Sequence, residues 1–165
     1  MRLWHYKTIK FLPAAQLLGQ WRECCAIASR WAAEGTPRHA LVNPILNYPI
    51  EDYIIFCKLV YDEMCNRGYY PQEYTVARLK DSFVTIYLYD AKDIPAIRET
   101  IEEIWRFNFD LDSLIIFEKW HNRQYLEICY WNLQEKYDCG CIPEAEWQRY
   151  LEGGKELVWT IFMKK

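Results

Sequence analysis

Apolar residues recur at helical spacing along most of the chain, and the clearest case follows Pro13. A rotation of about 100° per residue gathers five apolar side chains on one side of that segment: Leu17, Trp21, Cys24, Ala28 and Trp31. Pro13 suits the first turn of a helix, and Gly35 is typical of a helix end. The pattern therefore predicts a long helix from about Pro13 to Ala33. Residues 2–12 precede it as a short arm, which we expect to contribute little to the core.

The same spacing, together with flanking residues that favour helix ends, predicts further helices. Proline, asparagine or aspartate opens each of them, and glycine closes most of them. They run from Pro49 to Gly68, onward from Asp93, from Asn122 to Gly140, and from Pro143 to Gly153. After the first of these helices we expect an irregular stretch from Pro71 to Asp81.

Three short segments are rich in β-branched and aromatic residues, which favour strands. They cover residues 82–89, 113–119 and 156–163. Periodicity alone does not separate a short buried strand from a buried helix, so a helix stays open for them. We therefore predict a mainly α, compact fold organised on the long N-terminal helix, with a small β element left open.

Length and composition limit the class of protein. A chain of 165 residues suits one well-buried core and is short for two domains. Aromatic residues at 17% and hydrophobic residues at 52% exclude a disordered chain. No apolar run approaches the ~20 residues needed to cross a bilayer, and the N-terminus has no export signal. We expect one domain, residues 1–165, located in the cytoplasm, with no membrane partner.

The seven cysteines also suit a reducing compartment. Their number is odd, and most of them fall on apolar helix faces. Cys139 and Cys141 flank Gly140, but no second pair of ligands with zinc-site spacing accompanies them. We therefore predict packed thiols, with no metal and no cofactor.

The net charge of −3 is unevenly distributed. Residues 1–39 hold six Lys or Arg against two Glu, a net charge of +4, whereas the remainder has 14 basic and 21 acidic residues, a net charge of −7. Phosphate contacts dominate affinity for DNA, so a protein that bound DNA over its whole surface would not be acidic. A single basic DNA-binding surface formed by residues 1–39 would explain this uneven charge distribution, and chance clustering of basic residues would explain it equally well. The acidic remainder would suit a protein partner.

Polar residues occupy the other side of the first helix. The same rotation aligns Gln16, Gly19, Glu23 and Arg30, with Arg22 at the edge. Gly inside a helix costs roughly 0.5–1 kcal/mol relative to Ala. Its missing side chain would let another backbone approach Glu23. A solvated polar face that tolerates Gly19 is the alternative interpretation.

Four blocks of sequence carry a resemblance to a known family: MRLWH, QLLGQWRECCAI, RHALVNPILNYP and HNRQYLEICYWNLQEKYDCG. With them the chain resembles the pyrimidine dimer DNA glycosylases, the endonuclease V type of abasic lyase. The resemblance covers most of residues 1–75 and 118–150 and leaves out residues 76–117.

The resemblance implies covalent chemistry at the chain terminus. In that family the terminal α-amine attacks C1′ of the damaged nucleotide, expels the base and forms an imine, and β-elimination then cuts the strand. An α-amine is suited to this role because its ordinary pKa of about 7.7–8.0 is lowered by nearby arginines. Met1 would supply the amine, since the large Arg2 disfavours removal of the methionine. Glu23 matches the family's glutamate, and Arg22 matches its phosphate-holding arginine.

The resemblance also implies a partner, double-stranded damaged DNA. Arg2, Arg22, Arg30 and His39 are the predicted DNA-binding residues; His121 lies in a resembling block as well. The chain departs from the phage enzyme of this family at Ala26, where that enzyme has arginine, and at Leu17, where it has histidine. The basic aromatic tail of that enzyme is not recognisable, and Arg30 is the candidate to replace the missing arginine.

Two hypotheses follow from these features. The first is a DNA repair enzyme that acts in base excision: a glycosylase, which is a hydrolase, with abasic-site lyase activity. It would use a Schiff-base mechanism, with Met1 and Glu23 as catalytic residues. The second is a non-catalytic relative that acts as a small cytoplasmic DNA- or protein-binding module. The position of the chain terminus relative to Glu23 separates them.

Overall fold

The computed structural model describes residues 2–89 and 93–162, and these residues form helices and loops with no strand. In chain order the elements are η1 (Tyr6–Phe11), α1 (Ala14–Glu34), η2 (Asn43–Asn47), α2 (Ile50–Asn66), α3 (Glu73–Tyr87), α4 (Ile94–Arg106), α5 (Arg123–Asp138), α6 (Glu144–Gly153) and α7 (Lys155–Phe162); η marks a 3-10 helix. The predicted α class is confirmed. In these residues no helix is long and apolar enough to span a membrane.

The predicted long helix is α1, and its bounds agree with the sequence pattern. It begins one residue after Pro13 and ends at Gly35, whose φ of 72° is the left-handed conformation that glycine adopts without strain. All five residues of the predicted apolar stripe are buried. No side chain of its own caps the start of α1; instead the Glu146 carboxylate of α6 accepts a hydrogen bond of 2.6 Å from the Ala14 amide. A carboxylate is favoured at a helix N-terminus.

The other predicted helices are confirmed as α2, α4, α5 and α6. Two of them start at the predicted caps: Asp93 Oδ1 accepts from the Ala96 amide at 3.2 Å, and Asn122 Oδ1 accepts from the Tyr125 amide at 3.0 Å. Glycine follows α2 in the left-handed conformation, with a φ of 79° at Gly68. Capping and turn residues therefore predicted these boundaries well.

The small β element that the sequence left open is absent from the described residues. Residues 82–87 belong to α3, residues 156–162 belong to α7, and residues 113–119 form turns and loop. The expected irregular stretch from Pro71 to Asp81 was wrong, because α3 begins at Glu73. In α3, Leu79, Phe83 and Ile86 recur at helical spacing and are buried. Burial of a whole apolar face outweighs the helix-propensity penalty of β-branched residues, which is at most about 0.7 kcal/mol each.

The segment 113–119 is a buried loop that is fixed by side chains. Ile116 and Phe117 are buried, and Phe117 has a φ of 53°, in the left-handed region. Its amide donates to Asp52 Oδ2 at 2.7 Å, in the first turn of α2. No neighbouring strand exists in the described chain for this segment to pair with, so its polar backbone relies on such local partners.

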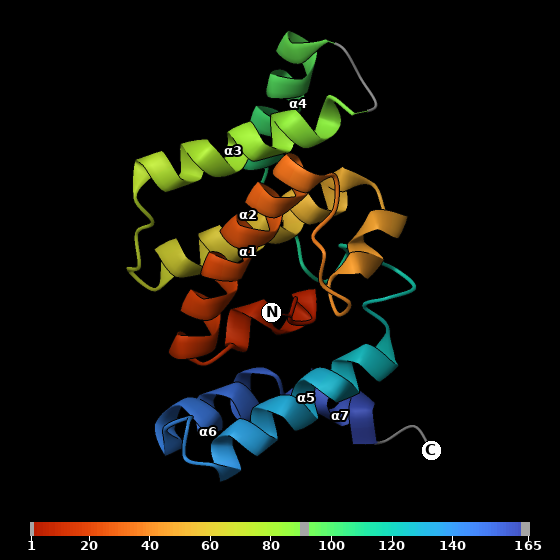
Figure 1. Ribbon diagram of the computed structural model, residues 1–165. Coiled ribbons are helices and arrows are strands. Elements are labelled where there is room, and N and C mark those ends of the chain that lie inside the picture. Colours follow the sequence, from red (N-terminus) through yellow and green to blue (C-terminus); the bar gives the residue numbers. More distant parts are fainter. Residues whose placement is uncertain (1, 90–92, 163–165) are drawn as a thin grey trace.

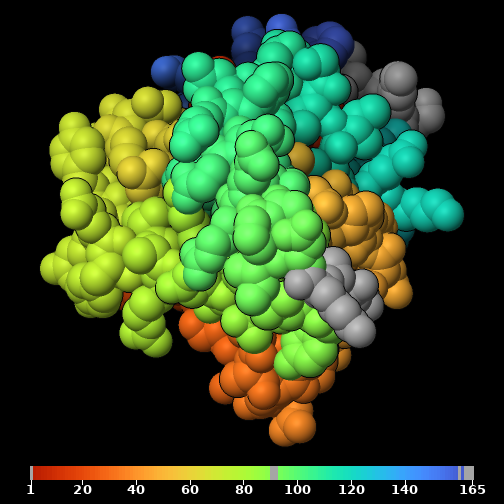
Figure 2. All heavy atoms as spheres, turned by 90° about the horizontal axis from the view of Figure 1, so that it is seen from above, coloured from red at the N-terminus to blue at the C-terminus, as the bar shows by residue number. Residues whose placement is uncertain are grey.

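The helices form two groups with the N-terminal arm between them (Figure 1). In the first group α1 packs against α2 and α3, and α4 packs on α2 and α3. In the second group α7 packs against α5 and α6. η1, which is part of the arm, contacts α2 of the first group and α6 of the second. Figure 2 shows α3 and α4 covering the end of the molecule that lies farthest from the second group.

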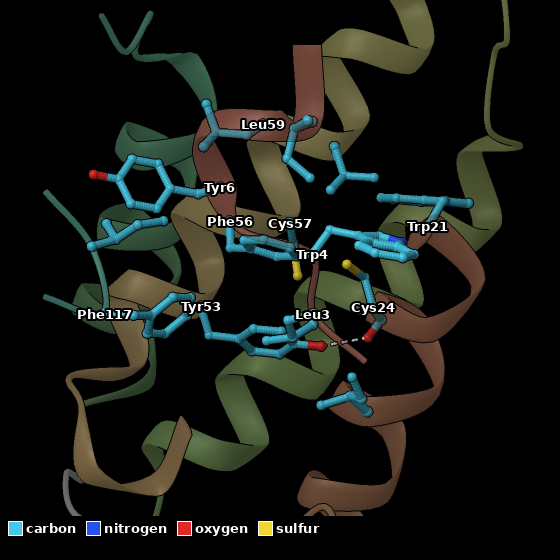
Figure 3. Packing of buried hydrophobic residues seen from close by; sticks show 14 of the residues in the cluster. Leu3, Trp4, Tyr6, Trp21, Cys24, Tyr53, Phe56, Cys57, Leu59 and Phe117 are labelled. Atoms are coloured by element: carbon cyan, nitrogen blue, oxygen red, sulfur yellow. Dashed lines mark hydrogen bonds between the residues drawn. The ribbon is translucent and has the colours of Figure 1, made fainter. Parts of the chain in front are cut away.

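The expectation that the arm contributes little to the core was wrong. Leu3, Trp4, Tyr6, Ile9 and Leu12 are all buried, and Leu3 and Leu12 are completely inaccessible. The guanidinium of Arg67 also holds the arm, donating to the carbonyl oxygens of Leu12 at 2.6 Å and Lys10 at 2.9 Å. Figure 3 shows Leu3 and Trp4 in one cluster with residues of α1 and α2. In the same cluster the buried Tyr53 hydroxyl donates to the Cys24 carbonyl at 2.7 Å.

Two buried histidines join the arm to the segment before α5. Nε2 of His5 donates to the His121 carbonyl at 2.8 Å, and the Tyr6 amide donates to His121 Nδ1 at 3.1 Å. The Lys7 amide donates to His5 Nδ1 at 3.3 Å, so each imidazole accepts at one ring nitrogen and is neutral. The two rings stack with 5.2 Å between their centroids. Burial lowers the pKa of His5 from 6.5 to about 4 and lowers that of His121 well below 6.5.

Acid should weaken the fold in the pH range that this histidine pair defines. The unfolded chain takes up a proton on each histidine near pH 6.5, whereas the folded protein takes one up on His5 only near pH 4. The contribution is fully present above pH 6.5 and is lost as the pH falls toward 4. His5 alone should account for about 3 kcal/mol of unfolding free energy over that range.

Chemical denaturation of the wild type and of His5→Gln at pH 8 and pH 5 checks this expectation. Gln keeps a donor for the His121 carbonyl but does not titrate. The stability advantage of the wild type should therefore shrink at pH 5. An advantage that is the same at both pH values would contradict it.

Candidate active site

The arm lies along α1, and side chains of α1 bind its backbone amides. The Arg2 amide donates to Glu23 Oε2 at 2.9 Å, and the Trp4 amide donates to Gln20 Oε1 at 2.8 Å. Gln20 and Glu23 are three residues apart, so they lie on adjacent turns of α1 and meet alternate residues of the extended arm. Glu23 is half-buried and Gln20 is buried. The carboxylate is thereby fixed beside the first residues of the chain.

Tyr125 of α5 binds the arm from the other side. Its hydroxyl donates to the Leu3 carbonyl, whereas the Trp4 amide of the same peptide group donates to Gln20 of α1. Burial raises the pKa of Tyr125, the charge of Arg2 opposes that rise, and the charge of Glu23 adds to it. Tyr125, Arg2 and Glu23 therefore lie within electrostatic reach of one another.

Arg2 adds a positive charge next to Glu23. The side chain is half-buried, and its Cζ lies 5.5 Å from the centroid of the Trp4 ring, a cation–π contact. Arg2 and Glu23 are the predicted site residues that the structure brings together. Met1, the predicted nucleophile, lies outside the described residues.

The other predicted DNA-binding residues are more scattered. Arg22 and Arg30 are exposed on α1, on the helix that also carries Glu23. His39 lies in the loop after α1, and its backbone amide donates to Asn43 Oδ1 at the start of η2 at 3.0 Å. Its Nδ1 is buried without a hydrogen-bond partner in the described part of the chain. His121 is buried and binds the arm through the contacts described above, so it does not line an open site.

Gln20 and Tyr125 were not predicted as site residues, although the position of Gln20 in the sequence indicates a buried polar side chain. Gln20 is three residues after Leu17 and four before Cys24, so it falls within the apolar stripe of α1. A buried amide side chain needs a hydrogen-bond partner, and its place in the stripe indicates that another backbone or side chain must reach it. Tyr125 left no comparable signal, because a tyrosine beside a helix cap is ordinary.

The described residues contain no group of three or more His, Cys, Asp or Glu side chains that could hold a metal ion. All seven cysteines are free: Cys24, Cys57 and Cys129 are buried, Cys25 and Cys65 are half-buried, and Cys139 and Cys141 are exposed. Among the described residues, Arg2 and Tyr125 are the ionisable neighbours of the Glu23 carboxylate named above.

Residues 1–75 match the family of pyrimidine dimer DNA glycosylases. The matched range includes the arm, α1 and α2, and with them Arg2, Gln20, Arg22 and Glu23. It confirms the resemblance over that part of the chain. No curated protein and no solved structure matches the chain.

Gly19 lies one turn before Glu23 and next to open space. A Cβ placed on it would meet no atom within 4 Å, so the expected approach of another backbone occurs at Glu23 and not at Gly19. Gly19→Ala should therefore stabilise the protein by roughly 0.5–1 kcal/mol, because alanine loses less backbone entropy in a helix.

Thermal and urea unfolding of Gly19→Ala would measure this gain. Gly35→Ala is the contrasting control, since its φ of 72° is unfavourable for alanine and the change should destabilise the protein. Equal effects of the two substitutions would contradict the description of Gly19 as an unobstructed helical position.

Proposed function

We propose that this protein, similar over residues 1–75 to pyrimidine dimer DNA glycosylases, is a DNA repair glycosylase with abasic-site lyase activity. Its partner is double-stranded damaged DNA, and its nucleophile is the terminal α-amine of Met1. One observation carries the proposal. The Glu23 carboxylate binds the amide of Arg2 at 2.9 Å, and the α-amine of residue 1 is joined to that nitrogen through one Cα and one carbonyl carbon.

The proposed reaction uses Schiff-base chemistry. The amine nitrogen bonds to C1′ of the damaged nucleotide while the bond from C1′ to the base breaks, and the base leaves with the electron pair. Ring opening then gives an imine between the amine and C1′. A proton acceptor then removes a proton from C2′, which expels the 3′ phosphate and cuts the strand. Glu23 is placed to stabilise the cationic imine and to accept the proton.

The charge distribution around α1 supports binding of a polyanion. Arg2 lies beside Glu23, and Arg22 and Arg30 are exposed on the same helix. Phosphate contacts by such residues fix the register of a duplex without reading its sequence. We also propose a cytoplasmic location, which seven free cysteines suit because disulfides are rare in reducing compartments.

The first test separates the chemistry from binding. Borohydride should reduce the proposed imine to a stable link on abasic or dimer-containing duplex, and proteolysis should place the adduct on the first peptide. Glu23→Gln keeps an oxygen that can accept from the Arg2 amide, so the arm should stay in place. Loss of the charge should slow strand cleavage by on the order of 10² or more.

A matched variant with extra residues ahead of Met1 moves the amine but leaves residues 2–12 in the core. It should lose trapping and retain the wild-type unfolding temperature. Wild-type protein with a free N-terminus that gives no trapped product on either duplex would overturn the proposed activity.

The second test concerns Arg22. If Arg22 contacts a phosphate, Arg22→Ala should weaken binding to abasic duplex and reduce the slope of log affinity against log salt by about 0.9. Fluorescence anisotropy over a salt series measures both quantities. Arg149→Ala is the control, because Arg149 is an exposed arginine on α6 that faces Glu146 at 3.8 Å. The same loss in both variants would indicate a general effect of charge and no contact at Arg22.

A further inference from the structure

A hollow of about 330 Å³ lies between α1 and α3, and its charge differs from that of three other hollows among the described residues. It is lined by Cys25, Ala26 and Ser29 of α1 and by Tyr74, Thr75, Arg78 and Leu79 of α3. None of these side chains is a carboxylate. Three other hollows among the described residues each include at least one, such as Asp62, Glu152 or Asp52. In a protein with a net charge of −3, this hollow is positively charged.

The guanidinium of Arg78 has no carboxylate partner among the described residues. Neighbouring cations on α3 and α4 do have one: Lys80 pairs with Glu102 at 2.8 Å, and Arg98 pairs with Asp81 at 3.0 Å. Arg78 acts across the hollow on the half-buried thiol of Cys25. Burial raises the pKa of that thiol to about 12, and the charge of Arg78 opposes the rise. Arg78 is therefore an exposed cation that faces the hollow and is not neutralised.

Two more arginines flank the hollow along α1. Arg22 and Arg30 lie four residues before and four after Ala26, so each is about one helical turn from it on the same side of α1. Both are exposed, and neither has an ion-pair partner in the described chain. Ala26 is exposed and small, so it leaves the space between the arginines open.

Two hydroxyl groups complete the lining. Ser29 and Thr75 form no side-chain hydrogen bond with other described residues, whereas Ser82 and Thr85 on α3 donate to the carbonyls four residues before them. The hollow thus offers hydroxyl and guanidinium donors and no anionic acceptor. A phosphate group is the complement, since its oxygens only accept and an arginine can bind two of them at once.

We propose that the hollow between α1 and α3 is a subsite for a DNA backbone phosphate, which Arg78 binds together with the hydroxyls of Ser29 and Thr75. The proposal rests on the proposed function, because it requires that the protein bind duplex DNA. It extends the DNA interface from α1 onto α3, and Arg78 lies beyond the residues that match the glycosylase family. A contact of this kind positions the duplex and carries no sequence or lesion specificity.

Binding of fluorescent undamaged and abasic duplexes over a salt series tests the subsite. Arg78→Ala should lower affinity about fivefold to tenfold at low salt and reduce the salt slope by about 0.9, by the same factor on both duplexes. Arg106→Ala is the control, because Arg106 is an exposed arginine of α4 that does not line the hollow. Its affinity and slope should remain close to those of the wild type.

Relocating the charge distinguishes a phosphate contact from a structural role. Ala26→Arg in the Arg78→Ala background places a cation at the same hollow from α1, and it should restore the salt slope. The subsite would be overturned if Arg78→Ala had the same affinity and salt slope as the wild type while Arg22→Ala bound DNA more weakly. That result would leave the proposed function standing. An equal loss in Arg106→Ala would also overturn the subsite. A wild-type protein that binds no duplex would overturn both proposals.

Discussion

Burying the backbone of the N-terminal arm requires a hydrogen-bond partner for each peptide group, and this constraint shapes the centre of the molecule. A buried amide or carbonyl without a partner costs about 1–3 kcal/mol. The 3-10 helix η1 pairs part of the arm with itself, since the Thr8 amide donates to the His5 carbonyl and the Leu12 amide to the Ile9 carbonyl. The extended residues before η1 take their partners from elsewhere. Gln20 and Glu23 bind amides of the arm from α1, and Tyr125 and His121 bind the arm from α5 and the turn before it. The helix groups are joined through these contacts.

This constraint explains why a carboxylate stands beside the first residues of the chain. Glu23 has a structural task, since its carboxylate accepts a hydrogen bond from the Arg2 amide. In the proposed reaction the same side chain would have a second task, acting on the substrate, and the helix surface at Gly19, one turn before it, is open. A glutamine can perform the first task, and only the carboxylate can perform the second.

The parts of the fold that the sequence predicted are those set by local chemistry. Gly35, Asn122 and Asp93 determine helix ends through contacts within a few residues, and the apolar stripe of α1 repeats over its whole length. The failures depended on partners far along the chain. α3 was misassigned because its β-branched residues suggested a strand while its burial against α1 made it a helix. At the site, Glu23 and Arg2 were predicted from a resemblance, whereas Tyr125 required the packing of α5 on the arm. Arg78 could not be placed beside Ala26 before the position of α3 was known.

The buried arm also has a consequence for synthesis of the protein on the ribosome. Residues 2–6 are made before two of their partners, His121 and Tyr125, which follow more than a hundred positions later, and Glu146, which caps α1, follows later still. α1 and α2 can pack as they emerge and can already bind the arm through Gln20, Glu23 and Arg67, whereas the contacts of the arm with α5 form only after most of the protein has been translated. The arm is thus among the last parts of the protein to complete its contacts, and a truncated chain that ends before α5 lacks the Tyr125 and His121 partners that help to hold the arm beside Glu23.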